Sequence, residues 1–502
     1  MTRAVTMKLS ELLPLCQGEL IIDPEGGDTE VSGMGLNAQE IGEGELFAGV
    51  PGTHVHGAKF AGQSKAAAII TDADGAKLLH DAGETRPVIK VTDVRAAMGP
   101  VADAIYGEPS KDLTIIGITG TSGKTTTSYL LEAGLMAAGL SVGLIGTTGT
   151  RINGEKVPTK LTTPEAPTLQ RLFAMMRDRG ATHVVMEVSS HAIALGRVGG
   201  TRFAANGFTN LSQDHLDFHP TMEDYFQTKA RFFKPDSPLR ADHCVVCVDD
   251  EWGQRMAELA GAGVRTVNST GGEADIVAGA PEVDATGAQH FDLALGERHL
   301  DVDLPLPGCF NVANASLAIA LGAAVGVDAT KLAHGIAHVA VPGRMERIDA
   351  GQEFLAVVDY AHKPAAIAAV LETLRGQVDG RIGIVVGAGG DRDISKRPIM
   401  GAEAVRGADF VVITDDNPRT EDPAAIRQAV LAGASEAAEG RQVSVEEVGD
   451  RSAAIRAAVE WARPGDAIVV AGKGHETGQL VGTTNHHFDD REELRRHIEA
   501  LQ

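Results

Sequence analysis

The chain has 502 residues, of which 43% are hydrophobic, and a formal net charge of −23. This length allows roughly two to four domains with complete hydrophobic cores. The negative charge argues against a nucleic acid as the main partner, although local basic groups can still bind small anions inside an acidic protein.

We expect no segment of the sequence to enter a membrane. A run of about 18 apolar residues is absent, and the first residues lack the apolar core of a signal peptide. We therefore expect a cytoplasmic protein. The four cysteines are too few for a disulfide scaffold. Cys244 and Cys247 lie three residues apart in an apolar, strand-like run, so they should face opposite sides and share neither a metal nor a disulfide.

Strand-like and helix-like segments divide the chain into three expected domains, 1–112, 113–341 and 342–502. The second and third alternate strands with helices, which indicates parallel sheets covered by helices on both faces. We predict an α/β protein with a small N-terminal domain, a central P-loop ATPase domain and a C-terminal Rossmann-like doubly wound domain. The predicted strands are 45–50, 66–71, 113–118, 141–145, 183–188, 203–208, 244–248, 354–358, 382–386, 410–413 and 467–470. The predicted helices are 124–138, 225–233, 364–374, 424–431 and 452–461.

A glycine-rich turn, TGTSGKTT at residues 119–126, joins the predicted strand 113–118 to the predicted helix 124–138. Such a turn directs backbone N–H groups and the positive end of the helix toward phosphate oxygens. Lys124 can neutralise the terminal phosphates, and Thr125 can bind magnesium. A strict P-loop has glycine where Ile118 stands. The residues predicted to surround ATP phosphates are Gly120, Thr121, Ser122, Gly123, Lys124, Thr125 and Thr126.

Polar residues follow the other strands of the central region, where α/β sheets bind ligands. Glu187, at the end of a strand, is a candidate magnesium ligand because its carboxylate is a hard oxygen donor, and the alternative is a helix cap. His215 follows the next strand and can bind a metal or phosphate, or have a structural role. The loop 162–165 carries hydroxyl groups suited to an anionic substrate. Lys229 lies on the predicted helix 225–233, and its spacing marks no role.

The C-terminal region places charged residues after several of its predicted strands. Three neighbouring loops carry two arginines, an asparagine and a glutamate, a set suited to an amino-acid zwitterion, because arginine binds carboxylate and acidic side chains bind ammonium. These residues are Arg392, Asn417, Arg419 and Glu476. Arg344 lies near the boundary at 341, where it can close over a phosphate or simply lie on the surface. Asp359 follows the strand 354–358 and can accept a hydrogen bond from ribose or an amine.

The ordered motifs resemble those of the Mur ligases, ATP-dependent amide-forming enzymes of peptidoglycan precursor synthesis. The resemblance covers nearly the whole chain, and the matching stretches are 120–125, 187–191, 209–217, 308–314, 343–346 and 359–362. Within the family the chain is similar to members that add the third residue to UDP-N-acetylmuramoyl-L-Ala-D-Glu. The run Asp-Asn-Pro-Arg at 416–419 looks like the motif of members that choose meso-diaminopimelate over L-lysine. Diaminopimelate carries a second carboxylate for Arg419 to pair with, and lysine does not.

The resemblance implies a role for each matching residue. Lys229 matches a lysine that is carbamylated to N6-carboxylysine and helps to hold Mg²⁺. The implied catalytic residues are Lys124, Glu187, His215 and Lys229, and the implied metal ligands are Thr125, Glu187, His215 and the Lys229 carbamate. The implied muramoyl-dipeptide contacts are Thr162, Thr163, Glu165, Ser189 and Arg197. The implied adenosine or phosphate contacts are Asn311, Arg344 and Asp359. The implied diaminopimelate contacts are Arg392, Asp416, Asn417, Arg419, Gly472 and Glu476.

The resemblance implies a ligase that joins these substrates through an acyl phosphate formed with ATP. We expect a monomer without a nucleic-acid partner. Two alternatives keep the enzyme class, a lysine-adding relative and a folylpolyglutamate synthetase-like ligase. Another class is a regulatory or mechanical P-loop ATPase, or a nucleotide-dependent binding module. The chain departs from the family at the uridine end, where Asn37, Ala38 and Gln39 replace the common Asp-Ser-Arg, and Leu195 stands where some relatives have Gln.

Overall fold

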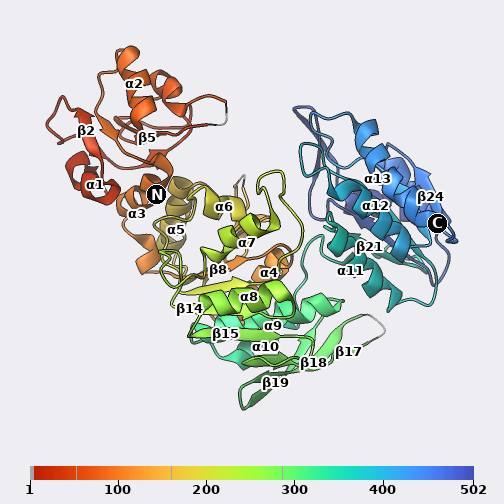
Figure 1. Cartoon of the computed structure of the whole chain (residues 1–502). Helices are drawn as coiled ribbons and strands as arrows, with labels where there is room; N and C mark the ends of the chain where they lie inside the picture. Colours follow the sequence, from red (N-terminus) through yellow and green to blue (C-terminus); the bar gives the residue numbers. More distant parts are fainter. Residues whose placement is uncertain (1–4, 53, 160, 285–286, 502) are drawn as a thin grey trace.

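The computed structural model, which describes residues 5–52, 54–159, 161–284 and 287–501, contains three α/β domains (Figure 1). The N-terminal domain packs on one end of the central domain, and the C-terminal domain lies along another side of it. Each of the three larger sheets takes its strands from one of the ranges 1–112, 113–341 and 342–502. The boundary positions themselves stay a prediction. None of the described helices is both long enough and apolar enough to cross a membrane.

The N-terminal domain is built on a five-stranded sheet in the order β2-β7-β6-β5-β4, with β2 antiparallel to β7 and the other pairs parallel. Its elements are β1 (Met7–Lys8), α1 (Leu9–Cys16), β2 (Glu19–Ile22), β3 (Glu30–Val31), β4 (Met34–Gly35), β5 (Leu46–Gly49), η1 (Gly57–Gln63), β6 (Ala68–Thr71), α2 (Ala73–Asp81), β7 (Val88–Lys90), α3 (Val94–Ile105) and η2 (Pro109–Lys111). Helix α3 packs against α5 of the central domain. At this junction a Cβ on Gly99 would lie 2.3 Å from the backbone of Gly199, so the close approach requires glycine.

The central domain is built on a twelve-stranded sheet in the order β11-β10-β9-β12-β8-β13-β14-β15-β16-β18-β17, with β19 paired to β18. Its strands are β8 (Thr114–Thr119), β9 (Val142–Gly146), β10 (Gly149–Ile152), β11 (Glu155–Val157), β12 (His183–Glu187), β13 (Ala205–Phe208), β14 (His243–Cys247), β15 (Val264–Asn268), β16 (Ile276–Ala278), β17 (Glu282–Val283), β18 (Gln289–Leu295) and β19 (Arg298–Leu304). Its helices are α4 (Lys124–Ala137), α5 (Ala166–Asp178), α6 (Ser190–Ala194), α7 (Met222–Ala230), α8 (Glu251–Ala260), α9 (Cys309–Ala324) and α10 (Ala329–Ile336).

Helices cover both faces of the central sheet, as predicted. Helices α4, α9 and α10 contribute to one hydrophobic core, and α5, α7 and α8 contribute to the other. Cys247 lies in the first core and Cys244 in the second, and both are free thiols. The expectation that the two cysteines face opposite sides of their strand is therefore confirmed.

The central sheet also contains antiparallel strands that the sequence analysis did not anticipate. Strands β10 and β11 extend one edge, and β17, β18 and β19 extend the other. Strand β18 alternates buried Phe291 and Leu293 with exposed His290, so one of its faces is solvated. Helix α7 also differs from its predicted bounds. It begins earlier because Thr221 Oγ1 accepts a hydrogen bond from Asp224 N and caps it.

The C-terminal domain is built on a six-stranded sheet in the order β20-β21-β25-β22-β23-β24, in which only β20 is antiparallel. Its strands are β20 (Glu346–Arg347), β21 (Leu355–Asp359), β22 (Ile382–Val386), β23 (Phe410–Ile413), β24 (Ser444–Glu447), β25 (Ala467–Ala471), β26 (Gly478–Val481) and β27 (Thr484–His487), the last two forming a separate hairpin. Its helices are α11 (Pro364–Arg375), α12 (Lys396–Gly407), α13 (Pro423–Ala438), α14 (Arg451–Trp461) and α15 (Asp490–Glu499). Helices α11 to α13 cover one face of the sheet, and α14 and α15 cover the other.

A fully buried ion pair joins α14 to α15. Arg451 Nε and Nη2 each lie 2.8 Å from a carboxylate oxygen of Asp490, and both side chains have 0% exposure. Arg451 Nη2 also donates to Ala471 O at 2.9 Å, and Nη1 donates to Asp415 O at 3.3 Å. One guanidinium therefore fixes the ends of β23 and β25, from which the predicted amino-acid loops leave.

Replacing Arg451 with methionine is expected to lower the free energy of unfolding of this domain by about 3–5 kcal/mol, because Asp490 loses its buried partner. Urea unfolding can be followed through Trp461 fluorescence in a Trp252→Phe background. The matched control is Arg456→Met on the same helix, whose pair with Glu460 is exposed and which should cost less than about 1 kcal/mol. Equal losses in the two variants would contradict the structural role of Arg451.

Candidate active site

The glycine turn between β8 and α4 adopts a conformation that requires its glycines. Gly120 and Gly123 have φ angles of 146° and 86°. A Cβ on Gly120 would lie 1.8 Å from Thr209 Oγ1, and one on Gly123 would lie 2.3 Å from Asn314 Oδ1. Asn210 Oδ1 accepts a hydrogen bond from Ser122 N at 3.0 Å. The turn is therefore held against the end of β13 and against α9 in the shape of a phosphate-binding loop.

Glu187 ends β12, the strand next to β8, and its carboxylate faces the start of α4. Thr125 Oγ1 donates to Glu187 Oε1 at 3.0 Å. Thr147 donates to both Glu187 oxygens, through its N–H at 2.9 Å and its hydroxyl at 2.9 Å. A carboxylate and a hydroxyl oxygen thus lie side by side next to the phosphate loop, and both are donors that Mg²⁺ accepts.

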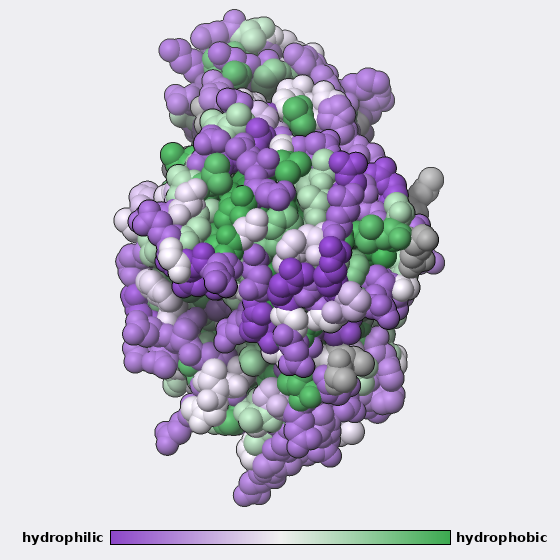
Figure 2. Space-filling view, turned by 90° about the vertical axis from the view of Figure 1, so that its right-hand side faces the viewer, coloured by the Kyte–Doolittle hydropathy of each residue, from purple (hydrophilic) through white to green (hydrophobic). Residues whose placement is uncertain are grey.

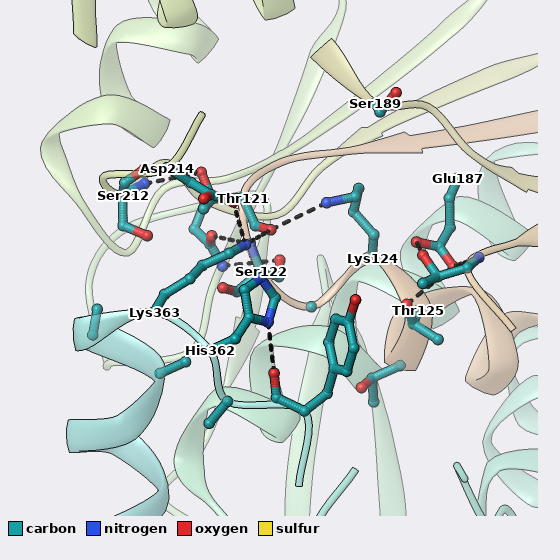
Figure 3. A pocket seen from close by; sticks show the side chains of 18 of the residues that line it. Thr121, Ser122, Lys124, Thr125, Glu187, Ser189, Ser212, Asp214, His362 and Lys363 are labelled. Atoms are coloured by element: carbon teal, nitrogen blue, oxygen red, sulfur yellow. Dashed lines mark hydrogen bonds and ion pairs between the residues drawn. The ribbon is translucent and has the colours of Figure 1, made fainter. Parts of the chain in front are cut away.

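Three lysine ammonium groups converge on two consecutive backbone carbonyls of the loop. Figure 3 shows two of these lysines, Lys124 and Lys363. Lys124 Nζ donates to Gly120 O at 3.0 Å and to Thr121 O at 3.1 Å. Lys229 Nζ donates to Gly120 O at 2.9 Å, and Lys363 Nζ donates to Thr121 O at 2.9 Å. Lys363 belongs to the C-terminal domain. This concentration of positive charge suits a polyanion.

The surroundings of these lysines weaken their protonation. Desolvation, followed by the charge of Lys363, lowers the pKa of Lys124 to about 8. Lys229 is 1% exposed, and burial, together with the charges of Lys124 and Lys363, lowers its pKa well below the ordinary value. A deprotonated Lys229 amine is a nucleophile, so this lysine can react in a way that a solvated helix lysine does not.

Among the described residues, His215 makes no hydrogen bond or ion pair with Thr125 or Glu187. Its backbone has a φ of 55°, and its Nε2 lies 3.2 Å from Asp214 Oδ2. Burial lowers the pKa of His215 to about 3, which leaves a neutral imidazole at neutral pH. Among the described residues, no three His, Cys, Asp or Glu side chains form a metal-binding group. The structure therefore pairs Thr125 with Glu187, and the wider ligand set stays a prediction.

A cavity of about 680 Å³ lies over the phosphate loop, between the central and C-terminal domains. Most residues predicted to contact ATP or the muramoyl-dipeptide line it. They are Thr121, Ser122, Gly123, Lys124, Thr125, Thr126, Asn311, Arg344 and Asp359, and Thr162, Thr163, Ser189 and Arg197. Glu165 is not a lining residue. Its carboxylate lies 2.9 Å from Arg197 Nε and 3.3 Å from Arg95 Nη1 of the N-terminal domain.

Arg344 reaches from the start of the C-terminal region into this cavity. Its Nη2 donates to Thr125 Oγ1 at 3.1 Å, and its guanidinium lies 4.5 Å from the centre of the Tyr360 ring. Asp359 accepts hydrogen bonds from Met345 N and Ala361 N, at 2.7 and 2.8 Å. Burial raises the pKa of Asp359, and the Arg344 charge opposes this shift. Both side chains are thus fixed at the interface of the two domains.

The C-terminal loops bring the predicted amino-acid contacts together. Asn417 Nδ2 donates to Glu476 Oε2 at 2.9 Å, and the fully buried Lys473 donates to Asn417 Oδ1 at 3.1 Å. A Cβ on Gly472 would lie 2.6 Å from Asp416 Oδ2, so this loop packs directly on the next one. The amide, carboxylate and ammonium groups of two loops, those after β23 and β25, therefore form one polar network.

Arg392 and Arg419 lie beside this network without a carboxylate partner. Arg419 Nη1 donates to Gly390 O at 2.6 Å, and Arg392 Nη1 donates to Asp391 O at 3.0 Å. Within the described ranges, no salt bridge involves either guanidinium. Burial, followed by the charge of Arg392, lowers the pKa of Arg419. Two cations with unfilled donor groups suit an anionic ligand, and Arg392 also lines the large cavity.

The sequence analysis assigned no role to three residues that the structure places at the site, namely Asp214, Lys363 and Lys473. Each lies in a stretch that follows a strand, so its position near the ligand-binding edge was predictable. The contacts of these residues were not predictable, because the contacting residues come from distant parts of the chain. Lys363, for example, contacts a carbonyl 242 residues away in sequence.

Known proteins resemble this chain in both sequence and structure. The family description "Mur ligase middle domain" matches residues 118–322, and "Mur ligase, glutamate ligase domain" matches residues 343–474. The UDP-N-acetylmuramoyl-L-alanyl-D-glutamate--2,6-diaminopimelate ligase of Corynebacterium glutamicum is 64% identical over 476 residues, which cover 93% of this chain and 92% of that protein. The protein of the same name from Corynebacterium efficiens is 59% identical over 506 residues, covering 99% and 96%. A solved structure with this name has a TM-score of 0.68 at 31% identity and covers 99% of both chains.

Proposed function

The chain belongs to the Mur ligase family, and from this premise we propose that it adds meso-diaminopimelate to UDP-N-acetylmuramoyl-L-alanyl-D-glutamate with consumption of ATP. It is an ATP-dependent carboxylate–amine ligase, and its product is a peptide bond of a peptidoglycan precursor. One observation carries the proposal furthest. The phosphate loop with its lysines and Arg392, which has no salt bridge among the described residues, line a single interdomain cavity.

The reaction has two chemical steps. The γ-carboxylate of D-Glu attacks the γ-phosphorus of ATP, the bond to the bridging oxygen breaks, and ADP leaves. The amine of diaminopimelate then attacks the acyl carbon, the bond to the phosphate oxygen breaks, and the amine proton is released. Lys124 and Arg344 are positioned to neutralise the transferring phosphoryl group, so catalysis rests on placement and electrostatics.

Mg²⁺ fits the oxygen pair of Thr125 and Glu187, and bound magnesium would supply further positive charge to the phosphates. His215 and a carbamate on Lys229 complete the proposed ligand set. Thr162, Thr163, Ser189 and Arg197 line the part of the cavity proposed for the muramoyl-dipeptide, and Glu165 acts there by holding Arg197. Asn311 and Asp359 are proposed adenosine contacts.

The chemistry of Lys229 supports its proposed carbamylation. A neutral amine attacks CO₂ to give a carbamate and one proton, and the pKa of Lys229 is held far below that of an exposed lysine. Its buried Nζ lies 2.9 Å from Gly120 O and 3.4 Å from Thr119 Oγ1, directly beneath the phosphate loop. Carbamylation would turn a repulsive cation at this position into an anionic oxygen ligand for a metal.

Lys229→Ala is expected to lose activity by about 100-fold, because an anionic ligand beneath the phosphate loop is removed. Short carboxylates such as acetate should restore part of it. Carbon-13-labelled bicarbonate should give a carbamate NMR signal in the unaltered protein and in Lys331→Ala, an exposed control, but not in Lys229→Ala. An unaltered protein without a bicarbonate-dependent signal would contradict the carbamate.

The amino-acid pocket is proposed to consist of Arg392, Asp416, Asn417, Arg419, Gly472 and Glu476. The guanidinium of Arg419, which has no salt bridge among the described residues, would bind the distal carboxylate of diaminopimelate, which lysine lacks. The relatives named above are diaminopimelate ligases by name, which favours this substrate over lysine. They cover 93% and 99% of this chain, which also argues against a folylpolyglutamate synthetase-like ligase or a mechanical ATPase.

We further propose a monomer that works in the cytoplasm, where ATP is supplied. On the side that carries the C-terminal domain, groups of hydrophobic residues lie among polar ones (Figure 2). The proposed domain boundaries remain 1–112, 113–341 and 342–502.

Phosphate release tests the proposed function. With ATP and Mg²⁺, rapid release should require both UDP-N-acetylmuramoyl-L-Ala-D-Glu and meso-diaminopimelate. Omission of either substrate should leave only background release. Rapid release without any amino acid would instead favour a regulatory or mechanical ATPase.

A further inference from the structure

Asp214 of the central domain lies close to two lysines of the C-terminal domain, Lys363 and Lys396. Its carboxylate lies 3.0 Å from Lys363 Nζ and 3.6 Å from Lys396 Nζ, and the Asp214 side chain is only 4% exposed. These two ion pairs tie the central domain to the C-terminal domain.

The two lysines that hold Asp214 differ in one respect. Lys363 Nζ also donates to Thr121 O of the phosphate loop at 2.9 Å, whereas Lys396 has no hydrogen bond to that loop in the described part of the chain. Lys363 follows β21, and it reaches the loop from a different side than Lys124 (Figure 3). Because both ammonium groups donate to Thr121 O, the conformation of the loop depends on a residue of another domain.

The charges around the loop are unbalanced. Lys124 and Lys363 both donate to Thr121 O, and among the described residues Asp214 is the only carboxylate within salt-bridge distance of Lys363. Buried like charges repel one another, so the docked arrangement is costly without a compensating anion. A bound triphosphate supplies that anion, and docking of the C-terminal domain should therefore be tightest when nucleotide is present.

We propose that Lys363 is a positioning residue for phosphoryl transfer. The C-terminal domain supplies this lysine to the phosphate loop of the central domain. This assignment rests on the proposed function. It makes the first step, formation of the acyl phosphate, depend on the C-terminal domain, which otherwise binds the amino acid for the second step. Acyl phosphate would form only while the C-terminal domain is docked, when the amine that consumes this water-sensitive intermediate is also close.

The test compares two lysines that share a carboxylate. Lys363→Met and Lys396→Met each remove one interdomain ion pair with Asp214, and only the first also removes a contact with the loop. The measurement is the single-turnover rate constant for ADP formation from ATP, Mg²⁺ and UDP-N-acetylmuramoyl-L-Ala-D-Glu, without diaminopimelate. Melting temperatures check that each variant is folded. If Lys363→Met does not fold, Lys363→Gln, which removes the charge and keeps an N–H donor, replaces it.

Lys363→Met should lower the rate constant at saturating ATP by about 100-fold, the usual effect of losing one electrostatic positioning group. Lys363→Arg should retain activity within about tenfold because charge and donors remain, and Lys396→Met should stay within about threefold. A Lys363→Met rate near that of the unaltered protein, or an equal loss in Lys396→Met, would overturn the inference in favour of simple domain adhesion. An unaltered protein that forms no ADP with the dipeptide would contradict the proposed function, and the inference would fall with it.

Discussion

Lys124→Ala is expected to abolish acyl-phosphate formation, with a loss of at least about 1000-fold in the single-turnover rate of ADP formation. Lys124 Nζ lies at the mouth of the phosphate loop, donates to Gly120 O and Thr121 O, and faces the interdomain cavity. No salt bridge of the described residues depends on Lys124, so the fold should survive its removal.

Radiolabelled ATP and rapid quenching measure this rate directly. The control is Lys156→Ala, an exposed lysine of β11, which should behave like the unaltered protein. Circular dichroism and the melting temperature should be unchanged in both variants. Normal phosphate release from a folded Lys124→Ala protein would refute the assigned role of the loop.

Arg419→Ala is expected to destroy the preference for meso-diaminopimelate over L-lysine. Its guanidinium has no carboxylate partner in the described structure and lies beside the network of Asn417, Lys473 and Glu476. Removing it leaves the distal carboxylate of the substrate unpaired, which should lower kcat/KM for diaminopimelate by about 100-fold. The value for lysine should change little, because lysine has no carboxylate at that end.

Competition between the two amino acids, with the products separated by mass, measures this preference. Arg406→Ala on α12, whose arginine is exposed and pairs with Glu403, provides a matched loss of charge in the same domain. An unchanged preference in Arg419→Ala would contradict the pocket assignment. A similar loss in Arg406→Ala would point to the overall charge of the domain instead.

The elements that the sequence predicted best are the buried parallel strands. Strands β22 and β23 have the predicted bounds, 382–386 and 410–413, because strands covered on both faces read as unbroken apolar runs. The phosphate loop was also predictable, since its chemistry depends on a few adjacent residues. Strand β18 was not predicted, because its buried residues alternate with exposed charged and polar ones and it has no unbroken apolar run.

The parts of the site that depend on contacts between distant residues could not be predicted from the sequence. Lys229 reads as a solvated helix lysine, and only the resemblance to Mur ligases implied a role. The structure buries its ammonium on Gly120 O, more than a hundred residues away. Lys363 shows the same limit, because its contacts with Asp214 and Thr121 exist only across a domain interface. Glu165 differs in the opposite way. It was expected to contact the substrate, but in the structure its carboxylate pairs with Arg95 and Arg197.

The mass of the product tests the central claim most directly. The protein would be incubated with ATP, Mg²⁺, UDP-N-acetylmuramoyl-L-Ala-D-Glu and equal amounts of meso-diaminopimelate and L-lysine. We predict a nucleotide tripeptide that carries diaminopimelate, formed with one ADP per molecule. ADP without a peptide adduct, or an adduct that carries lysine, would contradict the account.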